Sequence, residues 1–492
     1  MIIPFGDWLP DLGNFNNPGA LQAKNVIPTA NGNYRSFPAP IVLSDALTAR
    51  CQGAFSTLRA SNNDAYVYSG DATKLYQLVG NTTHTDASKS GGYNITSDDF
   101  WEFVRFGDTI IATNISDPLQ SITIGGANFA DLATSTLKPQ ARRIGATENF
   151  VILGDMSEGG TKYPYRVRWS ALNDAADYDA SANTQSDFQD FADGEQIMKI
   201  IGIGRDAYVF QRRGIHAMRY EGTPTVFRFD QVEKDRGLIA GQGIVSFGGY
   251  IFYIADDGFY QFDGMQSHPI GREKIDQFFF DDLAAGRLEL ISAAIDPVHS
   301  LVAWAYPTAS GGQNIPDRIL VYSWAVQKWA LIHTDTQFIF RDVSKGFTLD
   351  DLDSVSSTLE GLPFSLDSRV WSGGSIMIFS GFNADNKIIS FDGDPLPATL
   401  DTKEMNLMGR QRAAFFDGVW PIVDSPGTVT VAVGDRDTLQ EAEEFGAATG
   451  LNAIGEADIR SCARYHRFRV TATGGLTMAH GVEVDPRPGG RQ

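Results

Sequence analysis

The chain has 492 residues, of which 42% are hydrophobic and 11% aromatic, and it contains 50 glycines. This length exceeds what one hydrophobic core usually fills, and the composition excludes a disordered chain. The formal net charge of −20 argues against a protein that grips nucleic-acid phosphates, because such proteins need clustered Lys and Arg on their contact face.

Residues 1–50 are rich in Pro, Asn and Gly and carry isolated aromatic residues. Large apolar side chains without a regular period usually lie across something already folded. We therefore expect residues 1–50 to form an N-terminal arm that docks on the rest of the chain or on a neighbouring subunit. The segment Met1–Pro10 lacks the basic region of a signal peptide. No apolar run approaches the ~20 residues of a membrane span.

Short apolar runs followed by turn residues recur between residues 51 and 395. AYVYSGD, FVRFGD and FVILGD repeat one phrase, in which an apolar run precedes Gly-Asp, and YIFYIADDGFYQF has the same character. Strands of this length that end in residues tolerant of positive φ predict antiparallel sheet. The candidate blade-turn residues are Gly70, Asp71, Gly107, Asp108, Gly154, Asp155, Asp257 and Gly258.

The starts of these units are spaced by roughly 40–55 residues, comparable with the ~40–50 of known propeller repeats. We therefore expect an all-β fold, a β-propeller of five to seven blades over residues 51–395, with six favoured. A stack of β-sandwiches is the alternative. One helix is expected within residues 271–289 and a polar loop insertion near 340–363. Residues 396–492 are expected to form a small C-terminal β-domain.

No residue pattern in the sequence indicates chemistry. The seven histidines lack metal-ligand spacing, and no glycine-rich phosphate loop or GxSxG elbow is present. We expect no catalytic, cofactor-binding or metal-binding residues, and no cofactor. Cys51 and Cys462 are interpreted as two buried thiols in a reducing compartment, although a single disulfide between them stays open.

A glycosidase is the enzymatic alternative, because propellers often house paired carboxylates. Asp71, Asp108 and Asp155 recur at equivalent places, however, as structural turn residues do, and we favour turn-capping over catalysis by about ten to one. A second cluster, of Arg142, Arg143, Arg166 and Arg168, is compatible with carboxylate binding, but ion pairs between strands are the simpler account.

Several phrases, in this order, resemble a family of phage proteins. They are FGDWLPDLGNFNNPGALQAKNVIPTANGNYRSFP, WEFVRFGDTIIATN, ARRIGATENFVILGD, YRVRWSALND, TQSDFQDFADGEQIMKIIG, DGFYQFDG, HPIGREKIDQFFFDDL, ARYHRFRV and HGVEVDP. Together they resemble the nozzle, or tail-hub, proteins of short-tailed bacteriophages, also described as packaged-DNA stabilisation proteins. The resemblance covers most of the chain and is weakest over residues 340–400.

The resemblance implies a structural virion protein of the phage tail, assembled in the host cytoplasm as a hexameric ring. Such a ring extends the DNA channel below the portal and adaptor and carries a tail needle, fibre or tailspike. Double-stranded DNA passes through the lumen without sequence-specific binding, and the family has no catalytic residues. The alternative is a glycan-binding or polysaccharide-cleaving propeller of a tail or surface protein.

A ring of identical subunits needs two different complementary patches on each subunit. We expect these patches in the N-terminal arm and the C-terminal domain. The candidate subunit-interface residues are Phe5, Trp8, Phe15, Tyr34, Arg464 and Tyr465.

Overall fold

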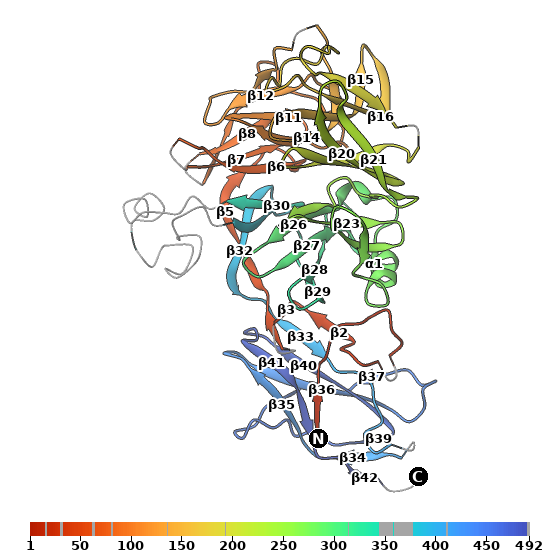
Figure 1. Ribbon diagram of the computed structural model, residues 1–492. Coiled ribbons are helices and arrows are strands. Elements are labelled where there is room, and N and C mark those ends of the chain that lie inside the picture. Colours follow the sequence, from red (N-terminus) through yellow and green to blue (C-terminus); the bar gives the residue numbers. More distant parts are fainter. Residues whose placement is uncertain are drawn as a thin grey trace.

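The computed structural model describes residues 1–14, 17–29, 33–61, 64–79, 82–134, 136–191, 193–312, 314–343, 358, 377–409 and 412–489. Small sheets arranged around an axis occupy the upper and central parts of Figure 1, and a β-sandwich occupies the lower part, where both chain ends lie. Phe15 lies outside the described residues, as does the expected loop near 340–363 apart from residues 340–343 and 358.

Among the described residues, six sheets of four antiparallel strands, together with four antiparallel strands of a ten-stranded sheet, form the seven blades of a β-propeller. The first blade contains β6 (Ala54–Leu58), β7 (Ala65–Gly70), β8 (Leu75–Val79) and β9 (Thr83–Asp86), and the second contains β10 (Glu102–Phe106), β11 (Thr109–Thr113), β12 (Gln120–Thr123) and β13 (Ala130–Asp131). The third blade contains β14 (Gln140–Ala146), β15 (Val151–Glu158), β16 (Thr161–Trp169) and β17 (Asp187–Asp190), and the fourth contains β18 (Ile197–Ile203), β19 (Asp206–Gln211), β20 (Gly214–Gly222) and β21 (Val226–Lys234).

The fifth blade contains β22 (Val245–Phe247), β23 (Tyr250–Ala255), β24 (Gly258–Phe262) and β25 (Ser267–Pro269). The sixth contains β26 (Ser292–Asp296), β27 (Leu301–Tyr306), β28 (Arg318–Ser323) and β29 (Lys328–His333). The seventh contains β30 (Phe338–Val343), β31 (Met377–Phe382), β32 (Lys387–Pro395) and β5 (Pro38–Ala46). The first strands of neighbouring blades, such as β10 and β14, pack beside one another. These strands therefore line the axis, and the fourth strands lie at the rim.

The last blade closes the ring with a strand from the N-terminal region. β5 pairs antiparallel with β32, with Ile41 opposite Ser390. Leu47, which follows β5, packs in one apolar cluster with Phe338 and Phe382 of the last blade. The ring is therefore locked by pairing between distant parts of the chain. The blade number is seven, which lies within the expected range and corrects the favoured six.

The Gly-Asp phrases lie at three different kinds of position: in a two-residue turn, at the start of a longer turn, and inside a strand. Gly107 and Asp108 form the two-residue turn between β10 and β11, and Gly107 has a φ of 61°. Asp71 begins the turn between β7 and β8, where its Oδ1 accepts the backbone N–H groups of residues 73 and 74 at 2.7 and 2.8 Å. Gly70 ends β7, and Gly258 begins β24 directly after the Asp256–Asp257 turn.

Gly154 and Asp155 do not form a turn, which corrects the third of the repeated phrases. They lie inside β15 at a β-bulge, where the pairing with β16 shifts register between Gly154 and Met156. Asp155 has a φ of 50° at this bulge. The strand continues to Glu158, and Gly159 and Gly160 make the turn instead.

One further sheet and the six remaining strands of the ten-stranded sheet form the sandwich, and each of these two layers combines both ends of the chain. One contains β1 (Ile2–Pro4), β41 (Met478–Val484), β4 (Tyr34–Ser36), β3 (Val26–Pro28) and β35 (Val419–Asp424). The other contains β2 (Gln22–Lys24), β33 (Ala398–Asp401), β40 (Tyr465–Ala472), β36 (Val429–Arg436), β37 (Glu444–Phe445) and β38 (Thr449–Gly450). A small sheet of β39 (Ser461–Ala463), β34 (Ala414–Phe416) and β42 (Arg487–Pro488) accompanies them, with the strand order β39-β34-β42.

The N-terminal region is woven into these sheets: it packs on the rest of its own chain, the first of the two expected alternatives, as strands of the sheets and not as a separate arm. Phe5 and Tyr34 are fully buried and Trp8 is 3% exposed, all within the apolar cluster of the sandwich. Tyr465 is buried as well, whereas Arg464 is exposed. Four of the candidate interface residues therefore pack inside their own subunit, where a neighbouring subunit does not reach them.

The propeller and the sandwich are joined by sheet and by core. β2 pairs in parallel with β29 of the sixth blade and antiparallel with β33, so that one sheet of ten strands runs through both parts. A single apolar cluster contains Phe259 and Trp329 of the blades together with Val431 and Val482 of the sandwich. The two parts therefore share one continuous core.

The expected helix of residues 271–289 is shorter than predicted. It comprises α1 (Asp276–Asp282), followed by the 3-10 turn η2 (Leu288–Leu290). Phe279 of α1 is fully buried, with its ring centroid 4.8 Å from that of Phe259 and 5.0 Å from that of Tyr306. The helix is thus pinned to blades five and six.

Candidate functional site

Several blades meet at the carboxylate of Glu102, which is 3% exposed. Its Oε1 lies 2.9 Å from Nη1 of Arg143, 3.0 Å from Nζ of Lys199 and 3.2 Å from Nε2 of Gln242. Its Oε2 accepts the backbone N–H of Ile144 at 3.2 Å. Glu102, Arg143, Lys199 and Gln242 are called the axial cluster below.

The axial cluster connects blades that are not neighbours in the ring. Lys199 reaches from the fourth blade to Glu102 in the second, and Gln242 belongs to the segment before the fifth. The backbone oxygen of Gln242 also accepts the N–H of Ala293 in the sixth blade, at 2.8 Å. Because blades diverge away from the axis, only groups close to it can bridge non-adjacent blades. The axial cluster therefore lies close to the propeller axis and bridges blades across it.

A second ion network lies beside the axial cluster. Arg142 Nε is 3.0 Å from Asp99 Oδ1, and its Nη1 is 3.0 Å from Asp155 Oδ2. Gln196 of the segment before β18 donates to the same Asp155 oxygen at 2.6 Å. Burial raises the pKa of Asp155, and the charge of Arg142 opposes that rise. The bulge thus gives Asp155 a role in linking blades, in place of the expected turn.

Arg166 and Arg168 lie elsewhere, on the outer half of the third blade. Both pair with Glu158, at 3.1 and 2.9 Å, and Arg166 also pairs with Asp190 at 2.7 Å. The Arg166 guanidinium lies 4.1 Å from the ring centroid of Phe188. The four arginines of the sequence pattern therefore form two separate sets of ion pairs between strands.

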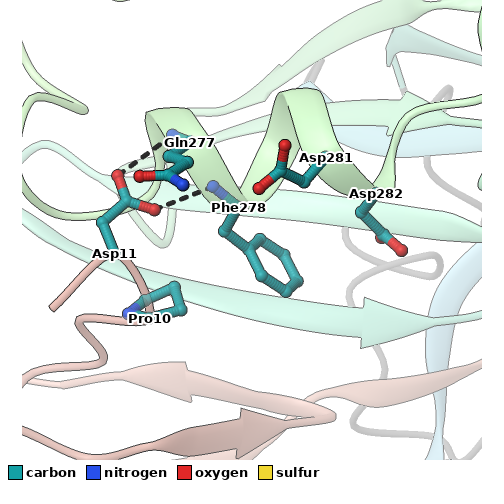
Figure 2. Close-up of a pocket in the computed structure, with 6 residues that line it drawn as sticks. All are labelled: Pro10, Asp11, Gln277, Phe278, Asp281 and Asp282. Atoms are coloured by element: carbon teal, nitrogen blue, oxygen red, sulfur yellow. Dashed lines mark hydrogen bonds between the residues drawn. The ribbon is translucent and has the colours of Figure 1, made fainter. Parts of the chain in front are cut away.

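An acidic cleft separates the N-terminal segment from α1 (Figure 2). Its volume is about 370 Å³, and its lining residues are Pro10, Asp11, Gln277, Phe278, Asp281 and Asp282. Figure 2 shows Asp11 accepting the backbone N–H groups of Gln277 and Phe278, at 3.1 and 2.8 Å. Asp282 accepts the hydroxyl of Tyr306 at 2.9 Å. These bonds hold the N-terminal segment, the helix and the sixth blade together, so the cleft is explained as a structural joint.

Asp276 lies at the start of α1, against the backbone. A Cβ on Gly271 would lie 1.9 Å from its Oδ1, and that oxygen accepts the N–H of Phe259 at 3.1 Å. Burial, with a smaller contribution from the charges of Asp11 and Asp257, raises the pKa of Asp276 to about 7, against opposition from the Phe259 hydrogen bond.

We expect Asp276 to make folding stability depend on pH. Its folded-state pKa of about 7 exceeds the ordinary value of 3.8, so the folded state holds the proton more tightly between these values. This contribution to stability is present at low pH and is lost as the pH rises through about 7. The melting temperature of Asp276→Asn, relative to that of the wild type, should therefore be higher at pH 8 than at pH 5. Thermal unfolding of both proteins at pH 5 and pH 8 tests this. A difference in melting temperature that is the same at both pH values would contradict it.

Ser461, His466 and Asp435 lie together in the sandwich but do not have the geometry of a catalytic triad. His466 Nε2 is 3.1 Å from Ser461 Oγ, and Ser461 Oγ donates to Asp435 at 2.5 Å. In a triad the carboxylate would bind the imidazole, whereas Nδ1 of His466 has no partner among the described residues. His466 is fully buried, and burial lowers its pKa to about 4. The group is therefore part of the core.

Over the described ranges, no group of three or more His, Cys, Asp and Glu side chains is arranged to hold a metal ion. Cys51 is buried against the last blade, as expected, whereas Cys462 is exposed, which corrects the expectation that both are buried; both are free thiols. None of the helices in the described part of the chain is long and apolar enough to cross a membrane.

Comparison with known proteins identifies similarity of fold only. No family model and no curated protein matches the sequence. Among solved structures, the Pan2 WD40 domain of Neurospora crassa is 10% identical, with a TM-score of 0.37, and the match covers 62% of this chain and 89% of that one. BamB from Moraxella catarrhalis is 10% identical, with a TM-score of 0.36 and coverage of 75% and 93%. The extracellular domain of BT4673 from B. thetaiotaomicron is 10% identical, with a TM-score of 0.42 and coverage of 83% and 47%.

Proposed function

We propose that this chain is a structural subunit of the tail nozzle of a short-tailed bacteriophage. Subunits assemble into a hexameric ring below the portal and adaptor, where the ring extends the DNA channel, retains packaged DNA and passes it during ejection. The order of the phrases that resemble the nozzle family supports this proposal. The β-propeller body is what that resemblance implies.

The observation that carries the proposal is the continuity between propeller and sandwich. A wall subunit must keep its shape while DNA under pressure moves past it. The ten-stranded sheet and the shared apolar cluster oppose hinge motion between the two parts, and β5 locks the last blade. A chain built as one block suits a structural task.

The position of the axial cluster bears on the path that we propose for DNA. Because Glu102, Arg143, Lys199 and Gln242 bridge blades across the propeller axis, we place the channel of the proposed ring between subunits and not through a propeller. The net charge of −20 suits such a channel, because an acidic wall repels the duplex and does not trap it.

Negative-stain images of the purified protein, alone and mixed with its portal–adaptor complex, test the proposal. We expect six-fold rings and a native mass of six times the 53.7 kDa chain. We also expect negligible binding of duplex DNA at moderate salt. A particle that stays monomeric in both samples, or tight DNA binding with a steep salt dependence, would contradict the proposal.

A further inference from the structure

A depression of about 450 Å³ lies between the outer strands of blades three and four. It is bordered by β17 on one side and by β20 and β21 on the other, and nothing in the ion networks above involves it. Its volume falls in the range of small-molecule sites.

The floor of the depression is aromatic. Phe191 is 8% exposed and Phe227 is 4% exposed, and Phe229 is half-buried beside them. The Phe191 and Phe229 rings meet edge to face, with centroids 5.1 Å apart. The floor therefore offers a rigid apolar surface that is already held in place by its own packing.

The rim is polar and carries little net charge. Gln189 of β17 and Gln231 of β21 are exposed on opposite sides. The guanidinium of Arg228 is paired with Glu221 and Asp230, at 2.8 Å each. These ion pairs leave amide groups as the main hydrogen-bonding partners for a ligand, which disfavours an anion.

His216 also lines the depression, and one of its ring nitrogens is buried without a partner among the described residues. It is 8% exposed, and its ring lies on Phe191 with centroids 4.5 Å apart. Its Nδ1 has no hydrogen-bond partner among the described residues. Burial lowers the pKa of His216, against the charge of Asp193, so the neutral imidazole keeps one donor and one acceptor. A buried polar atom without a partner is unfavourable unless a ligand or water satisfies it.

We propose that this depression binds one unit of a neutral saccharide. A sugar ring presents an apolar C–H face, which matches the floor of Phe191, Phe227 and Phe229, and a rim of hydroxyls, which both donate and accept hydrogen bonds as Gln189, Gln231 and His216 require. The site uses none of the contacts that join propeller and sandwich within the chain.

Saturation-transfer NMR and calorimetry of the full chain test this site, with neutral oligosaccharides of glucose, galactose, mannose, rhamnose and N-acetylglucosamine as probes. We expect at least one probe to bind with a Kd below about 10 mM, and Phe229→Ala and Gln231→Ala each to weaken it by about tenfold. Gln266→Ala, an exposed glutamine on blade five, is the matched control and should leave the affinity unchanged.

Three results would overturn the site. They are the absence of binding by every probe, wild-type affinity in both Phe229→Ala and Gln231→Ala, and binding of single-stranded oligonucleotide in place of sugar. Negative-stain images of Phe229→Ala keep the two proposals apart, because intact rings with lost sugar binding separate this site from assembly.

Discussion

Replacing Glu102 with alanine should lower the free energy of unfolding by about 3–5 kcal/mol, the range seen when one partner of a buried ion pair is removed. The Glu102 side chain is 1% exposed, and those of Arg143 and Lys199 are 9% and 21% exposed. The substitution leaves both cations near the propeller axis without a counter-charge and also removes the acceptor of Gln242. Urea unfolding followed by tryptophan fluorescence measures the effect.

Glu195→Ala is the matched control for that prediction. Glu195 pairs with Arg213 at 3.2 Å, but their side chains are 57% and 63% exposed. Pairs of this kind contribute little, so the change should stay within about 0.5 kcal/mol. Equal effects of the two substitutions would mean that the axial cluster is open to water and does not seal the axis.

Trp8→Ala should have a comparable effect, about 3–5 kcal/mol, because it removes a large buried side chain and leaves a cavity. Trp8 is 3% exposed and its ring meets Phe278 edge to face at 5.1 Å. The loss should appear first in the sandwich and the α1 joint. Hydrogen exchange measured by mass spectrometry would locate it there, with faster exchange in β1, β41 and α1.

Ile2→Ala provides the comparison, because Ile2 lies on the same segment but is 55% exposed. Its effect should stay within about 0.5 kcal/mol. If Trp8→Ala were as mild as Ile2→Ala, the N-terminal region would be a loosely docked arm after all. The burial of Trp8 also means that deletion of residues 1–20 tests folding of the sandwich before it tests ring assembly.

Local hairpins were readable from the sequence because turn and strands lie next to each other. FVRFGDTIIAT gives β10, the Gly107–Asp108 turn and β11, and YIFYIADDGFYQF gives β23 and β24. The all-β propeller followed from their recurrence. FVILGD led to a wrong turn prediction because the strand continues through a bulge at this phrase. The nearby SEGG run, with Gly159 and Gly160, was the better turn signal.

Features that depend on distant parts of the chain were not readable in this way. The seventh blade needs β5, which pairs with β32 across most of the propeller sequence. β1, β2, β3 and β4 have three residues each, too short for a period-two pattern, so buried Phe5 and Tyr34 looked like unpaired aromatics.

The axial cluster left only a weak signal in the sequence, and residue spacing alone could not show which of its members are in contact. Arg143 in QARRIGA and Lys199 in IMKIIGI are cations in strands with several apolar residues, and Glu102 begins a third such strand, EFVRF. A charged residue in such a strand calls for a buried partner. Which strands meet became clear only from the ring arrangement.

The count of this chain in purified phage particles tests the central claim most directly. Quantitative peptide mass spectrometry, with portal peptides as the internal standard, should give about six copies per particle, as a closed six-fold ring requires. A particle that lacks the chain, or contains it at a number no six-fold ring can accommodate, would contradict the account.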